Sequence, residues 1–253
     1  MEGSGNRIKD YRVYQLNTTQ MVFYSSIGFG MVILLSKVFY RSWIATIIMS
    51  PIIILYIQEK KRELCEKEKT ELNEQFKEAI IAVSNGLRAG YSIENAFREA
   101  YRDVTVMFGK DSNISKELFH ITKGLENNVL LESLLFDLAK RSCIDNILDF
   151  AEIFQTAKRS GGDMNNIIQS CVLTICDKIE VKKEIQTLLC AKQLEQKIMN
   201  LVPILIILYI QVTSPGFFDP LYHNIIGIVI MSICAILYGA AYKMAKNITT
   251  IQL

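Results

Sequence analysis

Four long stretches of the chain contain no Asp, Glu, Lys or Arg, and this constrains the fold more than any other feature. They are 24, 17, 21 and 23 residues long and cover residues 13–36, 42–58, 198–218 and 220–242. A bilayer core needs about 20 apolar residues in a helix, and its backbone groups are satisfied only in helices or closed barrels. The sequence therefore predicts an all-α, polytopic membrane protein with four transmembrane helices in two hairpins. The second stretch is short, so it crosses fully only if it includes Phe39–Arg41, with the Arg41 side chain reaching back to the interface.

The charged residues are concentrated between the two hairpins. Residues 59–197 hold 44 of the 54 charged residues, 21 basic and 23 acidic. We expect this segment to form a separate antiparallel helical bundle. It would be flanked by an N-terminal part (1–58) and a C-terminal part (198–253) that carry the hairpins. The near-neutral balance argues against nucleic-acid binding, which needs an excess of Lys and Arg.

The positions of the basic residues predict the orientation in the membrane. Arg7, Lys9 and Arg12 precede the first apolar stretch, and basic residues also flank both ends of the central domain and follow the fourth stretch. The loop of the first hairpin has only Lys37 and Arg41. Because cytoplasmic loops carry the excess of Lys and Arg, we expect both termini and the central domain on the cytoplasmic side of the cell membrane.

Apolar residues recur every three or four positions through the central segment, which is typical of amphipathic helices. Turn signals separate these helices. They are Gly90 with Ser92 as an N-cap, Gly124, and a Ser142–Asp145 pair that has the form of a capping box. Ser115 is a further candidate N-cap.

Two adjacent glycines, Gly161 and Gly162, lie in the motif KRSGGDM at residues 158–164. A phosphate-binding loop would need a Lys and a hydroxyl residue after the second glycine, but Asp163 follows and would place a carboxylate where the phosphate binds. A dinucleotide-binding turn would need a preceding strand, and the preceding pattern is helical. We interpret Gly161 as a left-handed helix end and Asp163 as the next N-cap, with the glycines as the pivot of an antiparallel helix pair.

Four segments of the chain, in order, carry a resemblance to a known family. The segments are LRAGYSIENAF (87–97), ITKGLENNVLLESLLFDLAKRS (121–142), FQTAKRSGGDMNNII (154–168) and EIQTLLCAKQLEQKIMNLVPI (184–204). Together they are similar to the type II secretion system F domain, and most of all to the inner-membrane platform proteins of Tad (tight adherence, Flp-type) pili. The resemblance covers about Phe76–Pro203, and the two-plus-two arrangement of apolar stretches is also similar.

The resemblance implies a non-enzymatic platform in the inner membrane around which a pilus or secretion machine assembles. The implied partners are a cytoplasmic secretion ATPase, pilin subunits and membrane lipid, with the chain itself in a homo- or hetero-oligomer. Larger members of the family carry two copies of the helical domain, whereas this chain carries one. The single-domain branch uses two related proteins, so the resemblance also implies a sister platform protein.

Two other classes of function are weighed against this one. A transporter or channel subunit would bring ionisable residues or broken helices to the middle of the membrane, but the apolar stretches are uncharged, and Pro51 and Pro203 lie near their ends. An enzyme could use Asp145, Asp149 and Glu152, which share one face of a predicted helix. A solvated or inter-subunit face explains these carboxylates more simply.

We expect neither a catalytic residue nor a cofactor or metal site. The sequence offers no nucleophile paired with a base, no nucleotide-binding loop and no metal-ligand spacing. The six cysteines form no CxxC pair and mostly occupy apolar helical positions, while His120 and His223 are far apart.

Two long intervals contain no Gly or Pro. They comprise 40 residues between Gly162 and Pro203 and 34 residues between Pro51 and Gly86. At 1.5 Å per residue they would form helices about 60 and 51 Å long. We expect each helix to run from the central domain into a membrane span, with Gln58–Lys77 and Asp163–Ile198 transmitting movement.

Overall fold

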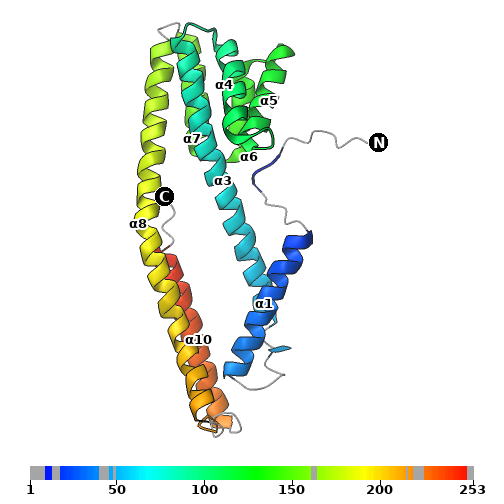
Figure 1. Cartoon of the computed structure of the whole chain (residues 1–253), viewed down its shortest axis with the longest axis vertical. Helices are drawn as coiled ribbons and strands as arrows, with labels where there is room; N and C mark the ends of the chain where they lie inside the picture. The colour runs from blue at the N-terminus through cyan, green and yellow to red at the C-terminus, as the bar shows by residue number, and fades with distance from the viewer. Residues whose placement is uncertain are drawn as a thin grey trace, which may run out of the picture. The chain divides into compact units, whose positions relative to one another are not determined.

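The computed structural model is helical wherever regular secondary structure is described. It describes residues 9–12, 18–39, 46–47, 50–160, 164–214, 216–218 and 225–249. The helices are α1 (Thr18–Phe39), α3 (Pro51–Arg88), α4 (Ile93–Phe108), α5 (Asn113–Glu126), α6 (Leu131–Ser142), α7 (Asp145–Ser160), α8 (Met164–Thr213) and α10 (Ile225–Thr249) (Figure 1). The predicted all-α class is therefore confirmed.

The chain divides into two compact units. The bundle unit comprises residues 1–15 and 62–181, and the apolar unit comprises residues 16–61 and 182–253. The bundle unit is shorter at both ends than the predicted central segment 59–197, and it also includes the N-terminal residues. Both α3 and α8 contribute residues to each unit.

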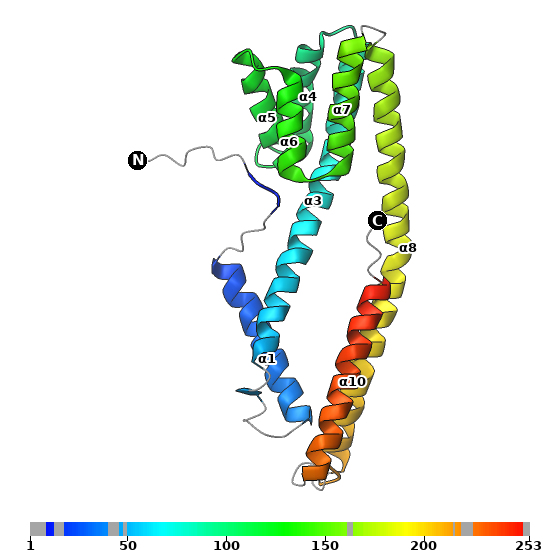
Figure 2. The same cartoon turned by 180° about the vertical axis from the view of Figure 1, so that it is seen from behind.

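The bundle unit has one continuous apolar core. Helices α4–α7 pack against the C-terminal half of α3 (Figures 1 and 2). On α3 the apolar residues at this three- and four-residue spacing are buried at Leu72, Phe76, Ile80, Val83 and Leu87. The ring of Phe76 meets that of Phe150 on α7 edge to face at 5.7 Å. The first part of α8 adds its own buried stripe, at Ile168, Cys171, Val172, Ile175 and Ile179.

The turn after α3 has the geometry that the sequence indicates. Helix α3 ends at Arg88, and Gly90 follows with φ +87°, a left-handed conformation that glycine adopts without strain. Ser92 is the N-cap of α4, because its side chain accepts a hydrogen bond from the backbone N–H of Asn95.

Three other turn predictions need correction. Ser112, not Ser115, caps α5, and its hydroxyl accepts from the backbone N–H of Ser115. Ser142 lies in the last turn of α6, where its hydroxyl donates to the carbonyl of Ala139, so it opens no capping box. Gly124 is helical, two residues before the end of α5.

Gly124 lies at a close packing contact rather than in a turn. A Cβ atom at this position would lie 2.7 Å from both methyl carbons of Leu134 on α6. Real Cβ atoms do not approach other atoms so closely, so the absent side chain lets α5 and α6 come together. The predicted pivot residues Gly161, Gly162 and Asp163 lie outside the described residues.

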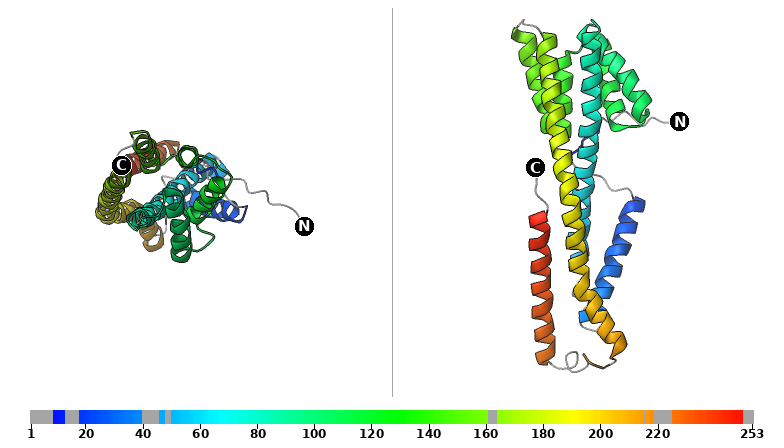
Figure 3. Two further views of the ribbon diagram at one scale, coloured as in Figure 1. Left: turned by 90° about the horizontal axis from the view of Figure 1, so that it is seen from above. Right: turned by 60° about the vertical axis from the view of Figure 1, so that its left-hand side comes forward.

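The apolar unit contains α1, the first turns of α3, the second part of α8 and α10. Helix α10 runs beside α8 (Figure 3), where the Tyr238 hydroxyl donates to the carbonyl of Asn200 at 2.7 Å. On α1, Gly28 lies against the side chains of Tyr56 and Ile53 of α3. Helix α8 contains a segment long and apolar enough to cross a membrane, and none of that segment is buried. Shorter apolar stretches lie at Thr18–Leu34 and Val229–Ala245.

Candidate functional site

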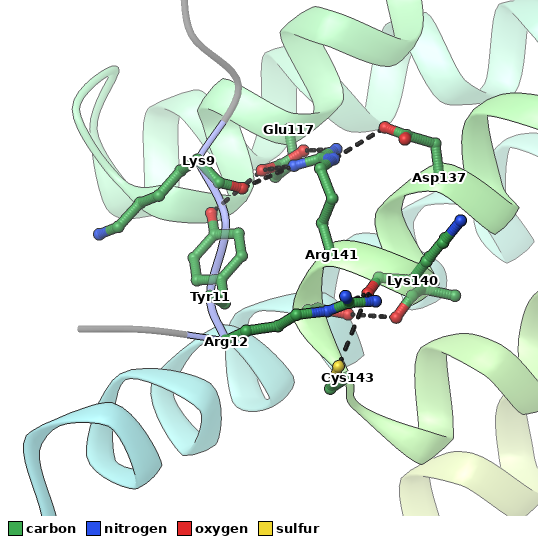
Figure 4. A network of polar contacts seen from close by, with 10 residues as sticks. Lys9, Tyr11, Arg12, Glu117, Asp137, Lys140, Arg141 and Cys143 are labelled. Carbon is green, nitrogen blue, oxygen red and sulfur yellow. Dashed lines mark hydrogen bonds and ion pairs between the residues drawn. The ribbon is translucent and has the colours of Figure 1, made fainter. Parts of the chain in front are cut away.

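A short N-terminal segment of the bundle unit, Lys9–Arg12, packs against the helices of that unit through a network of polar contacts (Figure 4). We call this segment the strap. Its anchor is Tyr11, which is only 3% exposed and belongs to the bundle core. The side chains that hold the strap come from α3, α5 and α6, which are distant in sequence from it. The strap therefore adds a connection to the bundle that the helices themselves do not provide.

An ion pair between α5 and α6 lies beneath the strap and contacts it directly. The Arg141 guanidinium donates two parallel hydrogen bonds to the Glu117 carboxylate, Nη1 to Oε1 at 2.8 Å and Nη2 to Oε2 at 2.7 Å. The Nε of Arg141 donates to Asp137 at 2.7 Å. The Glu117 side chain is 4% exposed and that of Arg141 15%. Two-point contact of this kind fixes the orientation of the guanidinium as well as its position.

The strap contacts this ion pair through both side chain and backbone. The Tyr11 hydroxyl donates to Oε1 of Glu117 at 3.1 Å, and Nη1 of Arg141 donates to the carbonyl of Lys9 at 3.0 Å. The Lys9 ammonium pairs with Glu68 on α3, whose carboxylate also accepts from the Asn113 amide. Each partner of the buried pair therefore also binds the strap.

The strap also caps the C-terminal end of α6. The last four carbonyls of a helix have no partner within the helix. Here the carbonyl of Arg141 accepts from the backbone N–H of Tyr11 at 3.1 Å. That of Lys140 accepts from Nε and Nη2 of Arg12, at 3.2 and 2.9 Å. The Arg12 guanidinium thus places a positive charge at the negative end of the helix dipole.

Burial and neighbouring charges shift the pKa of two groups in the site, Tyr11 and Arg141. Burial raises the pKa of the Tyr11 hydroxyl well above its ordinary value, and the negative Glu117 carboxylate raises it further. Burial acts to lower the pKa of Arg141, but its bonds and charge interactions with Glu117 and Asp137 outweigh this and raise it. Tyr11 is therefore a neutral donor and Arg141 a cation whenever the strap is bound.

The carboxylates weighed for an enzyme do not join this site. Asp149 of α7 is paired with Lys178 of α8 at 3.1 Å, while Asp145 and Glu152 are exposed on the same face of α7. Among the residues that the structure describes, no three His, Cys, Asp or Glu side chains are grouped as a metal site would require.

The Tyr11–Glu117–Arg141 arrangement is missing from the sequence predictions. One signal for it exists, because Glu117 falls on the buried stripe of α5, between Ile114 and Leu118. A charged residue at such a position needs a buried partner. The partner itself has no local signature, since Tyr11 is 106 positions away.

Comparison of the chain with protein-family models, with curated proteins and with solved structures gave no match.

Proposed function

We propose that this chain is a non-enzymatic platform protein of the inner membrane. In this role it couples a cytoplasmic secretion ATPase to the assembly of a Tad or type IV-like pilus, or of a type II secretion-like machine. The proposal combines the resemblance to the type II secretion system F domain with the distribution of apolar side chains in the two units. Its partners would be the ATPase, a sister platform protein, pilin subunits and membrane lipid.

The observation that carries the membrane role is the opposite placement of apolar side chains in the two units. In the bundle unit most of the large apolar residues of α3–α7 line the core, with exceptions such as Val106 and Met107, whereas in the apolar unit many large apolar side chains are exposed. Burying one such side chain stabilises a protein by about 1.5–3 kcal/mol, so this surface is unfavourable in water and suited to lipid. Side chains at least 60% exposed there include Val22, Phe23, Ile54, Leu55, Met199, Tyr209, Val212, Ile226, Ile236 and Leu237.

The four-span arrangement is part of the proposal. In it, α1 and the first turns of α3 form one hairpin, and the end of α8 with α10 forms the other. Pro203 lies inside α8, and such an interruption is tolerated in membrane helices because neighbouring groups satisfy the freed carbonyl. Close to this proline, the Tyr238 hydroxyl of α10 donates to the carbonyl of Asn200 on α8 and joins the paired helices.

The sidedness of the bundle unit tests the membrane role. In a background without native cysteines, Lys110→Cys would report the α4–α5 loop and Asp219→Cys the predicted outer loop. Lys110 is preferable to Ser112, whose hydroxyl caps α5. We expect a membrane-impermeant maleimide added to whole cells to label position 219 and to leave position 110 unlabelled until the cells are permeabilised. Labelling of position 110 in intact cells would reject the orientation.

A second experiment tests the platform role itself. Deletion of the chain should abolish the surface pilus or secreted product of its host while the ATPase and pilin are still made. The full chain extracted in detergent should co-purify with the ATPase or with a sister protein. Catalytic turnover by the purified chain, abolished by changing Lys158 or Asp163, would contradict a non-enzymatic role.

A further inference from the structure

We propose that the strap, Lys9–Arg12, is a releasable latch that leaves the bundle unit as one piece while the helices stay folded. The inference rests on the strap contacts alone, so it does not depend on the membrane role proposed above.

The surface that receives the strap is built by the bundle itself. Arg141 is oriented by Glu117 of α5 and Asp137 of α6, and none of these contacts involves the strap. The same guanidinium then donates to the Lys9 carbonyl. Arg141 and the end of α6 are therefore in place before the strap binds and after it leaves.

Only one side chain of the strap is buried in the bundle. Of its four residues only Tyr11 is buried, while Lys9, Asp10 and Arg12 are exposed. Segments with few buried apolar contacts open locally with less free energy than the whole domain needs to unfold. The helices are held by the continuous core, to which α3–α8 all contribute. We therefore expect the strap to detach far more often than any helix.

Release has defined consequences for the groups left behind. The carbonyls of Lys140 and Arg141 lose the donors that the strap supplies, and the negative end of α6 loses the Arg12 charge. A bound strap thus covers the C-terminal end of α6, and a released strap leaves that end without these donors.

A native thiol reports the state of the strap. The Sγ of Cys65 on α3 donates to the carbonyl of Tyr11 at 3.3 Å and lies 3.8 Å from that of Arg12. A bound strap should shield this thiol from alkylation. Cys176 on α8 is also partly buried, and this burial is the main reason that the pKa of its thiol is raised. It packs against the core, away from the strap contacts described above, and so reports opening of the helices.

The test compares alkylation rates in full-length chains, in detergent, that retain either Cys65 alone or Cys176 alone. Tyr11→Ala should accelerate labelling of Cys65 about tenfold or more and change that of Cys176 less than about twofold. Arg12→Gln, at an exposed position where the fold is not at risk, should accelerate Cys65 by a smaller factor. Lys140→Gln is the matched control, because its carbonyl, not its side chain, binds Arg12; it should change neither rate.

The outcomes separate a latch from a fixed part of the core. Selective acceleration at Cys65 in both strap variants supports the latch. If both cysteines were alkylated faster by similar factors, the strap would open only together with the helices, and the proposal would be overturned. Unchanged labelling of Cys65 in both variants would also overturn it, because the strap would then neither shield the thiol nor depend on its own contacts.

Discussion

Arg141 and Glu117 join α6 to α5 through two parallel hydrogen bonds, and the same guanidinium holds the carbonyl of Lys9 in the strap. One ion pair therefore serves both the helix packing and the attachment of the N-terminal segment. Its two roles can be separated by mutation, because removal of the strap leaves the pair complete, whereas removal of either charge damages both.

Glu117→Gln should destabilise the bundle strongly. The change leaves the largely buried Arg141 cation with an incomplete partner, and breaking a buried pair costs about 3–5 kcal/mol. In a chain of this size such a loss lowers the thermal midpoint by about 6–20 °C. Thermal unfolding of the full chain in detergent, followed by circular dichroism, measures the shift.

Two further variants make this prediction specific. Replacing both Glu117 and Arg141 by Leu should recover much of the loss, because no unpaired charge then remains buried. Glu99→Gln removes an exposed partner of Arg102 at 2.7 Å, and such surface pairs contribute at most about 1 kcal/mol. A Glu99 variant as unstable as the Glu117 variant would contradict the importance of burial.

The strap should also weaken at alkaline pH. The pKa of Tyr11 in the folded protein is raised above its ordinary value of 10.0 by burial and by the Glu117 charge. A group with a raised folded pKa contributes its full stability below the unfolded pKa and loses it as pH rises above that value. The contribution of Tyr11 is therefore complete at neutral pH and declines above about pH 10.

Tyr11→Phe isolates this effect from the other groups that titrate at high pH. The variant keeps the buried ring but loses the hydroxyl that donates to Glu117. We expect the thermal midpoint of the wild-type chain to exceed that of Tyr11→Phe at pH 8, and the difference to shrink by pH 11. A difference that grew with pH would mean that the hydroxyl is not a buried neutral donor.

The fold of the bundle could be predicted from local pattern, but the strap site could not. The stripe from Leu72 to Leu87 and the Ser92 cap follow from spacing and residue type within one helix or turn. Tyr11 meets Glu117 across 106 positions, and no local rule pairs them. In the sequence, Lys9 and Arg12 indicated only which side of the membrane the N-terminus occupies.

Two helix-breaking residues, Gly86 and Pro203, lie inside helices. Helix α3 continues past Gly86, where a Cβ would lie 3.1 Å from that of Ala96 on α4, so this glycine serves close packing. Helix α8 continues past Pro203 to Thr213. Proline removes one backbone donor but does not end a helix whose neighbours satisfy the freed carbonyl. Gly86 therefore serves packing inside α3, which ends at Arg88, two residues before the left-handed Gly90.

Gly124 should tolerate no branched side chain. Its missing Cβ lets Leu134 of α6 lie against α5, so Gly124→Val overpacks a buried contact and should cost about 1–3 kcal/mol. Leu134→Ala in the same chain opens space for the valine and should make the effect of Gly124→Val smaller. Thermal unfolding of the two single variants and the double variant measures the coupling. If the loss of stability in the double variant equalled the sum of the losses in the two single variants, the two residues would not be in contact.

A Gly-Gly insertion after Lys192 should stop assembly of the pilus or secretion machine without unfolding the protein. Helix α8 is continuous from Met164 to Thr213, and position 192 lies on it between the bundle core residues and the predicted span. If α8 transmits movement of the bundle to the membrane hairpins, two glycines would loosen it there, because each weakens a helix by about 1 kcal/mol relative to Ala. The same insertion after Lys110, in the α4–α5 loop, is the control and should be tolerated.

We expect the position-192 variant to insert into the membrane and bind its partners but to build no pilus. Normal assembly by that variant would show that α8 only anchors the bundle, and the coupling role would then have to be abandoned.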